Sequence, residues 1–197
     1  MIVILDRQHA GKRSSPNDVG ATFDLDGDGV RGEAGEREID LTAGYIAAAA
    51  VSLRTTGHTV HLIDSGAYDE RHLAAIKIAK AAPALRCAYI ACHVNAGGGK
   101  YGLIEYDVRS IKGAQLADEL AFALGMLEVG RGRTKGLGAA DRGWVCIGGI
   151  YAGPSNLSGV IYEPFFCDYV GHRPLMSPAG LVRVGHALAD GCTGWGA

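Results

Sequence analysis

Residues 2–9 read Ile2-Val3-Ile4-Leu5-Asp6-Arg7-Gln8-His9, and this stretch decides the fold class. An apolar run without polar alternation is typical of a strand buried on both faces, as in a parallel sheet. After the strand comes a long polar stretch, residues 10–35, rich in Gly, Asp, Ser and Asn. A loop of this length in a compact protein is usually functional. The first 35 residues therefore predict a buried strand with a functional loop at its carboxyl end.

Strands and helices then alternate along the rest of the chain. The apolar periodicity predicts helices over residues 36–56, 68–82, 113–129 and 177–190. It predicts further strands over residues 59–63, 87–92, 101–108, 144–150 and 159–163, with a loop over 130–143. This order favours an α/β fold, with a mostly parallel twisted sheet of about six strands and helices on both faces. We expect residues 1–197 to form a single domain.

Composition excludes several classes of protein. The 19 Lys and Arg against 21 Asp and Glu give a net charge of −2, which disfavours nucleic acid as a partner. The apolar run over residues 2–5 is too short for a signal-peptide core or a membrane segment. The five cysteines form no CxxC pair, so we interpret them as reduced structural thiols. We accordingly expect synthesis in the cytoplasm without a signal peptide.

Three predicted strands end in side chains that can bind metal or move protons. His9 follows the first strand, His93 follows residues 87–92, and Glu163 ends residues 159–163. Glu36 opens the first predicted helix. In a parallel sheet these strand ends meet at one edge, where binding sites lie. Two histidines with one carboxylate form a common catalytic zinc set, and a second carboxylate can serve as the acid/base. The alternative interpretation is that His9 and His93 are ordinary loop residues.

Four blocks of sequence resemble the zinc-dependent N-acetylmuramoyl-L-alanine amidases of the amidase_3 family. Residues 4–11 (ILDRQHAG) are similar to the family's ILDPGHGG, and residues 36–41 (EREIDL) to its EKDINL-like helix start. Residues 90–96 (IACHVNA) are similar to its SIHANA block, and residues 161–166 (IYEPFF) to its LVExGF block. The blocks occur in the family's order and cover nearly the whole chain. Arg7 and Gln8 replace the Pro and Gly of the family's first block, and Pro164 replaces a Gly of its last block. We expect these differences to alter the substrate groove more than the metal site.

The resemblance implies that His9, Glu36 and His93 bind one Zn²⁺ and that Glu163 is the catalytic acid/base. It implies hydrolysis of the amide between N-acetylmuramic acid and L-alanine, with peptidoglycan as the partner. We expect a monomer that acts on the bacterial cell wall, after release of the phage endolysin type or as part of a larger bacterial enzyme. No separate wall-binding domain is expected. The alternatives are a zinc carboxypeptidase acting on stem peptides and a catalytically silent peptidoglycan-binding relative.

Further residues are candidates for supporting roles. Asp6 and Asn95 lie at strand ends, where they could orient the ligating histidines. The basic loop containing Arg131 and Arg133 could contact acidic muropeptides, although a solvated loop is the simpler interpretation.

One acidic motif lies inside the long first loop. Its side chains at Asp24, Asp26 and Asp28 have the D-x-D-x-D-G spacing of a calcium loop. The closing glutamate at position 12 of such a loop is replaced by Gly35. The sequence therefore leaves two interpretations open, a Ca²⁺ site and a solvated acidic turn.

Overall fold

The computed structural model describes residues 1–12, 15–127 and 132–197, and its strands form one six-stranded sheet. The strand order is β2-β1-β3-β6-β4-β5. The strands are β1 (Ile2–Arg7), β2 (Thr59–Ile63), β3 (Cys87–Cys92), β4 (Leu103–Asp107), β5 (Arg133–Leu137) and β6 (Leu157–Glu163). The pairs in this sheet are parallel except β4 with β6. The mostly parallel α/β fold that we expected is therefore confirmed.

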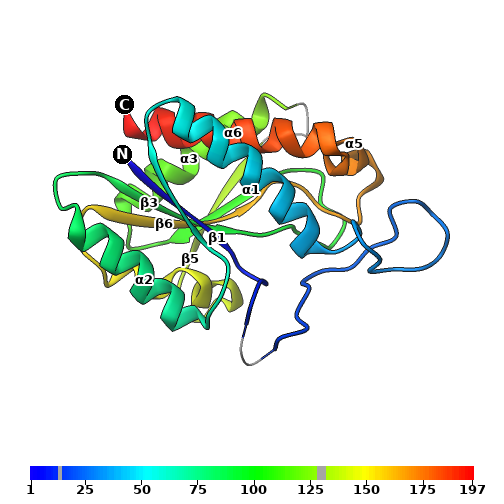
Figure 1. Ribbon diagram of the computed structural model, residues 1–197, viewed down its shortest axis with the longest axis horizontal. Helices are drawn as coiled ribbons and strands as arrows, with labels where there is room; N and C mark the ends of the chain where they lie inside the picture. Colours follow the sequence, from blue (N-terminus) through cyan, green and yellow to red (C-terminus); the bar gives the residue numbers. More distant parts are fainter. Residues whose placement is uncertain (13–14, 128–131) are drawn as a thin grey trace.

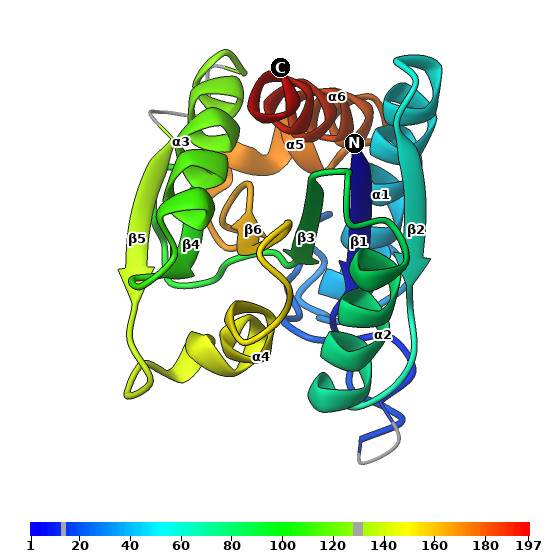
Figure 2. The ribbon, with the colours of Figure 1, turned by 90° about the vertical axis from the view of Figure 1, so that its left-hand side faces the viewer.

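Helices cover both faces of the sheet (Figures 1 and 2). One face carries α1 (Glu38–Thr55), α3 (Ile111–Gly125) and α6 (Pro178–Gly196), together with the short α5 (Arg173–Met176). The other face carries α2 (Tyr68–Ala81) and α4 (Gly148–Tyr151). Two short 3₁₀ turns, Arg142–Cys146 and Val170–His172, lie between these elements. The molecule thus has three layers, with the sheet in the middle.

The alternation of side chains along the inner strands builds two cores. In β1, Val3 and Leu5 pack into the cluster under α1, α3 and α6, whereas Ile2 and Ile4 pack into the cluster under α2 and α4. Successive residues of a strand point to opposite faces, so both sets must be apolar when helices cover both faces. This explains why the opening run lacks polar alternation.

Helix α1 ends where the sequence predicts. Its buried positions, including Leu41, Tyr45, Ala49 and Leu53, recur at helical spacing along one side. The chain leaves the helix after Thr55, and Gly57 adopts a φ of 85°. This left-handed conformation favours glycine, because a Cβ atom would strain it.

The structure corrects two expectations in the second half of the chain. Residues 144–150 do not form a strand; they form the 3₁₀ turn and most of α4, with Ile147 and Ile150 buried. Short apolar runs fit a buried helix as well as a strand. Conversely, β5 lies inside the stretch predicted as a loop. It is an edge strand with only Leu137 buried, so its polar sequence carries no hydrophobic signal.

All five cysteines are free and buried, as the absence of paired spacing indicated. No helix among the described residues is long and apolar enough to cross a membrane.

Candidate metal centre and active site

The ends of β1 and β3 bring two histidines together. The strands are parallel and in register, with Arg7 opposite Cys92, so the residues that follow them leave the sheet at the same edge. His9 Nε2 lies 3.3 Å from His93 Nδ1. The convergence of the two histidines expected from the sequence is therefore confirmed.

The carboxylate that completes this cluster is Glu38, the first residue of α1. Its Oε1 lies 2.9 Å from His93 Nδ1 and 3.3 Å from His9 Nε2. Three donors bound to zinc in tetrahedral geometry, with bonds of about 2.0–2.1 Å, are separated by about 3.3 Å. The three observed separations match this triangle, so His9, Glu38 and His93 fit a zinc ion.

Glu36 takes a different position from the one we expected, and the prediction that it joins the histidines is corrected. Its carboxylate turns back to the preceding loop, where Oε1 accepts hydrogen bonds from the amides of Leu25 and Asp26. The helix begins two residues later than predicted, at Glu38. The signal was present in the sequence, since Glu38-Ile39-Asp40-Leu41 fits the Glu-x-Asp-apolar start of the motif, whereas residues 36–39 have Glu38 at its Asp position.

Hydrogen bonds hold the Glu38 carboxylate in its ionised form. Oε2 accepts from the Ala21 amide and Oε1 from the Val94 amide, both at 2.9 Å. Burial raises the pKa of Glu38, but the hydrogen bonds with His9 and His93 outweigh it and hold the pKa below its usual range. The start of a helix also favours a negative charge.

Each histidine is oriented through its second ring nitrogen. His9 Nδ1 lies 2.9 Å from Asp18 Oδ1, and Lys12 lies 2.7 Å from the other oxygen of that carboxylate. Burial raises the pKa of Asp18, yet hydrogen bonds from Lys12, the Gly20 amide and His9 lower it to about 2. Sequence reasoning missed Asp18, because it lies in the irregular first loop.

His93 has a second contact that the sequence did not indicate. Its Nε2 lies 3.8 Å from Cys146 Sγ. Burial lowers the pKa of His93, but its hydrogen bonds with Cys146 and Glu38 raise it to about 10. Without metal, a proton on His93 therefore balances the Glu38 carboxylate, and a cation at this place would displace that proton.

Glu163 ends β6 on the same edge of the sheet. Burial raises the pKa of its carboxyl group to about 7, with Glu105 and Glu38 adding to the effect and His93 opposing it. Asn95 Nδ2 donates a hydrogen bond to Glu163 Oε2. The predicted supporting residue Asn95 thus positions the glutamate rather than a histidine.

A cavity of about 670 Å³ joins these groups. His9, Glu38 and His93 line it together with Glu163, so a buried carboxyl group shares one open space with three side chains that could hold a metal ion. Other lining residues include Tyr68, Glu105, Arg142, Val145 and Cys146. This arrangement can bind a substrate, polarise it and transfer a proton.

Asp6 has a structural role in this arrangement. It is fully buried and forms an ion pair with Arg71 of α2, and it accepts hydrogen bonds from Gln8 and Tyr89. Arg71 also donates to the carbonyl of Ala10. The pair ties α2 to the turn that leads into His9, so Asp6 acts on the histidine only through the backbone.

Of the two predicted basic contacts, Arg133 does not line the cavity. Arg131 lies outside the described residues. Arg133 stacks on Tyr101, with its guanidinium carbon 3.9 Å from the ring centre. The cation that does line the cavity is Arg142, at the start of the 3₁₀ turn after β5.

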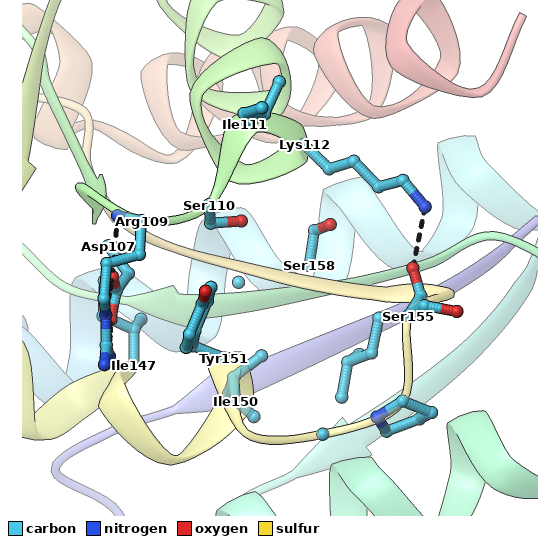
Figure 3. A pocket seen from close by; sticks show the side chains of 14 residues that line it. Asp107, Arg109, Ser110, Ile111, Lys112, Ile147, Ile150, Tyr151, Ser155 and Ser158 are labelled. Carbon is cyan, nitrogen blue, oxygen red and sulfur yellow. Dashed lines mark hydrogen bonds and ion pairs between the residues drawn. The ribbon is translucent and has the colours of Figure 1, made fainter.

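A second, smaller cavity of about 250 Å³ lies at the opposite end of β6 (Figure 3). Asp107, Arg109 and Ser158 line it, and Lys112 donates to the carbonyl of Ser155 at its rim. Arg109 and Asp107 form an ion pair with each other. This cavity is separate from the His9 cluster, because β6 separates Ser158 from Glu163.

The structure is similar to several solved proteins. It superimposes on AmiC2, an N-acetylmuramoyl-L-alanine amidase of Nostoc punctiforme, with a TM-score of 0.70 and 18% identity, covering 99% of this chain and 96% of that one. The chain has the fold of the N-acetylmuramoyl-L-alanine amidases. The amidase fold also relates it to the catalytic domain of the CD27L endolysin targeting Clostridia difficile, with a TM-score of 0.59, 18% identity and coverage of 95% and 96%.

A longer protein shares the amidase fold as well. Cwp6 from Clostridium difficile matches with a TM-score of 0.77 and 19% identity over 98% of this chain, which spans only 29% of the Cwp6 chain. By sequence alone, neither a protein-family model nor a curated protein matches the chain.

Proposed function

We propose that the protein is a zinc-dependent N-acetylmuramoyl-L-alanine amidase, which hydrolyses the amide between N-acetylmuramic acid and L-alanine in peptidoglycan. The observation that carries the proposal is the donor triangle of His9, Glu38 and His93 beside Glu163. The amidase fold supports the choice of substrate. The ligand set differs from the sequence-based expectation only in Glu38 replacing Glu36.

The metal ligands and Glu163 have different roles in the hydrolysis of the amide. Zinc held by His9, Glu38 and His93 would polarise the scissile carbonyl and lower the pKa of water to about 7. Glu163 accepts the proton of the attacking water and then delivers it to the leaving nitrogen of L-alanine. Burial raises the pKa of Glu163 above its usual range, which favours a carboxyl group that can accept the proton and then release it.

Neighbouring side chains orient Glu163 and His9. Asn95 fixes the orientation of Glu163 through its side-chain amide. Asp18 holds the ring of His9 so that Nε2 faces the triangle. The lining residue Arg142 offers a positive charge to the carboxylates of a stem peptide.

The biological setting stays a prediction. We expect peptidoglycan of a bacterial cell wall as the substrate and a monomer as the active form. We also expect residues 1–197 to act as one catalytic domain, and release of the phage endolysin type fits a protein made in the cytoplasm.

Product analysis tests the proposed reaction. Purified peptidoglycan is digested with the zinc-loaded protein, and the products are examined by mass spectrometry and N-terminal labelling. The proposal predicts new L-alanine amino termini and intact glycan strands. Release of D-alanine without new L-alanine termini would instead identify a carboxypeptidase, and no product from any wall type would indicate a silent relative.

Two variants separate metal binding from proton transfer. Glu163→Gln keeps the three ligands, so we expect it to bind one zinc per chain and to lose activity. His93→Ala removes a ligand, so we expect it to lose both. Substantial activity in Glu163→Gln would show that the proton relay is wrong.

A further inference from the structure

The cavity of about 250 Å³ at the amino end of β6 lies at the start of helix α3 (Figure 3). Ser110 caps this helix, and its Oγ accepts a hydrogen bond from the Gly113 amide at 2.9 Å. The first two helical residues, Ile111 and Lys112, also line the cavity, and their amides have no acceptor among the residues that the structure describes. Such unpaired N–H groups give the start of a helix a partial positive charge.

The first turn of α3 carries a charge of the sign that a helix start disfavours. It has no acidic residue, and it contains Lys112. Lys112 Nζ donates to the Ser155 carbonyl at 2.8 Å and pairs with no carboxylate in the described parts of the chain. Among the lining residues only Asp107 is acidic, and it is already paired with Arg109 and accepts from Trp144 Nε1. The positive charge of Lys112 and of the helix start therefore lacks a counter-charge.

A buried hydroxyl group points independently to a ligand. Ser158 is 2% exposed and lines the cavity, and its Oγ has no hydrogen-bond partner. Figure 3 shows this hydroxyl pointing from β6 toward Ser110 and Lys112. A buried polar group without a partner is costly, and native structures normally provide one. The partner of Ser158 is therefore expected between β6 and the start of α3.

We propose that this cavity binds a phosphate group, held by the amides at the start of α3, by Lys112 and by the hydroxyl groups of Ser110 and Ser158. The bound anion supplies the missing counter-charge and accepts the hydrogen bond of Ser158. The site lies at the opposite end of β6 from Glu163, so this binding goes beyond the proposed hydrolysis of an amide.

The number of donors favours phosphate over a carboxylate. Lys112 uses one of its three N–H donors on Ser155, and the Ser110 hydroxyl can still donate while its oxygen accepts. A phosphate ester presents three strong acceptor oxygens and a charge of about −1.5 to −2 near pH 7. A carboxylate presents only two oxygens and a single charge. Two amides, two hydroxyl groups and an ammonium group therefore match a phosphate better.

The rest of the cavity wall favours a phosphate ester over the free ion. Ile150, Tyr151 and Pro154 line it with largely apolar surface. Tyr151 is held in place by Arg109, whose guanidinium carbon lies 4.2 Å from the centre of the ring. The cavity is slightly smaller than drug-sized pockets of about 300–1,000 Å³, which suits the phosphate ester of a small alcohol.

Solution NMR of the full chain locates the binding site. Zinc-loaded protein labelled with ¹⁵N, without free zinc, is titrated with glycerol 3-phosphate, inorganic phosphate or acetate at an ionic strength kept constant with NaCl. For such small ligands we expect a dissociation constant on the order of 1 mM, so the titration extends to about 20 mM. The amide shifts of Ile111 and Lys112 should change most. The ester should bind more tightly than inorganic phosphate, and acetate at least about tenfold more weakly than either. The reverse order of the two phosphate compounds would assign the same site to the free ion.

Matched variants assign the binding to these side chains. Lys112→Gln removes the unpaired charge and should weaken phosphate binding about tenfold or more. Ser158→Ala should also weaken it, yet without phosphate this variant should unfold at the same or a higher temperature than the parent, because it loses a buried hydroxyl that has no partner. Lys100→Gln removes the same charge beside Tyr169, which follows the carboxyl end of β6, and should bind phosphate as the parent does.

Three results would overturn the proposal. The first is no change at the start of α3 at the highest concentration of either phosphate compound. The second is a set of shift changes confined to the surroundings of His9 and His93, which would place the anion at the metal centre instead. The third is phosphate binding that Lys112→Gln and Ser158→Ala leave unchanged, or acetate binding as tight as phosphate binding.

Discussion

Glu163 should destabilise the metal-free protein in a pH-dependent way. Its carboxyl group has a pKa of about 7 in the folded protein, against an ordinary value of 4.5. Between these two values the folded state holds a proton that the unfolded state has released. The free energy of unfolding therefore falls as the pH rises from about 4.5 to about 7, and this contribution is flat outside that window.

Replacement by glutamine removes this contribution. Glutamine has nearly the shape of glutamate, and its carbonyl can still accept the hydrogen bond from Asn95. One pKa unit corresponds to about 1.4 kcal/mol, so the stability of Glu163→Gln relative to the parent should increase by roughly 2.5 kcal/mol from pH 5 to pH 8. The comparison of two proteins at each pH cancels the titration of the groups that do not interact with Glu163.

Urea unfolding at several pH values measures this difference. Both proteins are kept free of zinc with a chelator, and Glu119→Gln on the exposed surface of α3 serves as a control for the loss of one charge. Added zinc should flatten the pH dependence, because a nearby cation lowers the pKa of Glu163. A difference between Glu163→Gln and the parent that stays constant within about 0.5 kcal/mol would refute the assignment of a raised pKa.

Further predictions concern the groups around the metal centre. Glu38→Gln should lose zinc while Glu36→Gln retains it, as measured by elemental analysis, because only Glu38 lies beside the histidines; equal zinc content would contradict the corrected ligand set. Asp18→Asn should weaken zinc binding by about 10–100-fold in a competition titration, since it removes the charge that orients His9. Arg71→Met should lower the free energy of unfolding by about 3–5 kcal/mol, because it removes the charged partner of Asp6 in the core, and the added change Asp6→Asn should restore part of it.

The sequence predicted the elements that carry a strong apolar pattern. The run at residues 2–5 and the strand over 87–92 are apolar on both faces, and their parallel pairing follows from the alternation with helices. This was enough to bring His9, His93 and Glu163 to one edge. The edge strand β5 could not be found in this way, because Arg133 and its neighbours face solvent.

The remaining parts of the site depend on contacts that no local pattern encodes. Glu36 and Glu38 can both be aligned with the glutamate of the helix-start motif, and the position of the first helical turn decides between them. Asp18 contacts His9 across an irregular loop, and Cys146 contacts His93 from a segment predicted as a strand. Asn95 was recognised as a supporting residue, but its partner Glu163 lies on another strand.

The central claim is that Glu38, with His9 and His93, holds a zinc ion beside Glu163. Diffraction from crystals of the zinc-loaded protein, recorded on both sides of the zinc absorption edge, tests it directly. We expect one anomalous peak between His9 Nε2, His93 Nδ1 and Glu38 Oε1, facing the cavity that contains Glu163. A peak beside Glu36, or no peak at the two histidines in zinc-saturated protein, would contradict it.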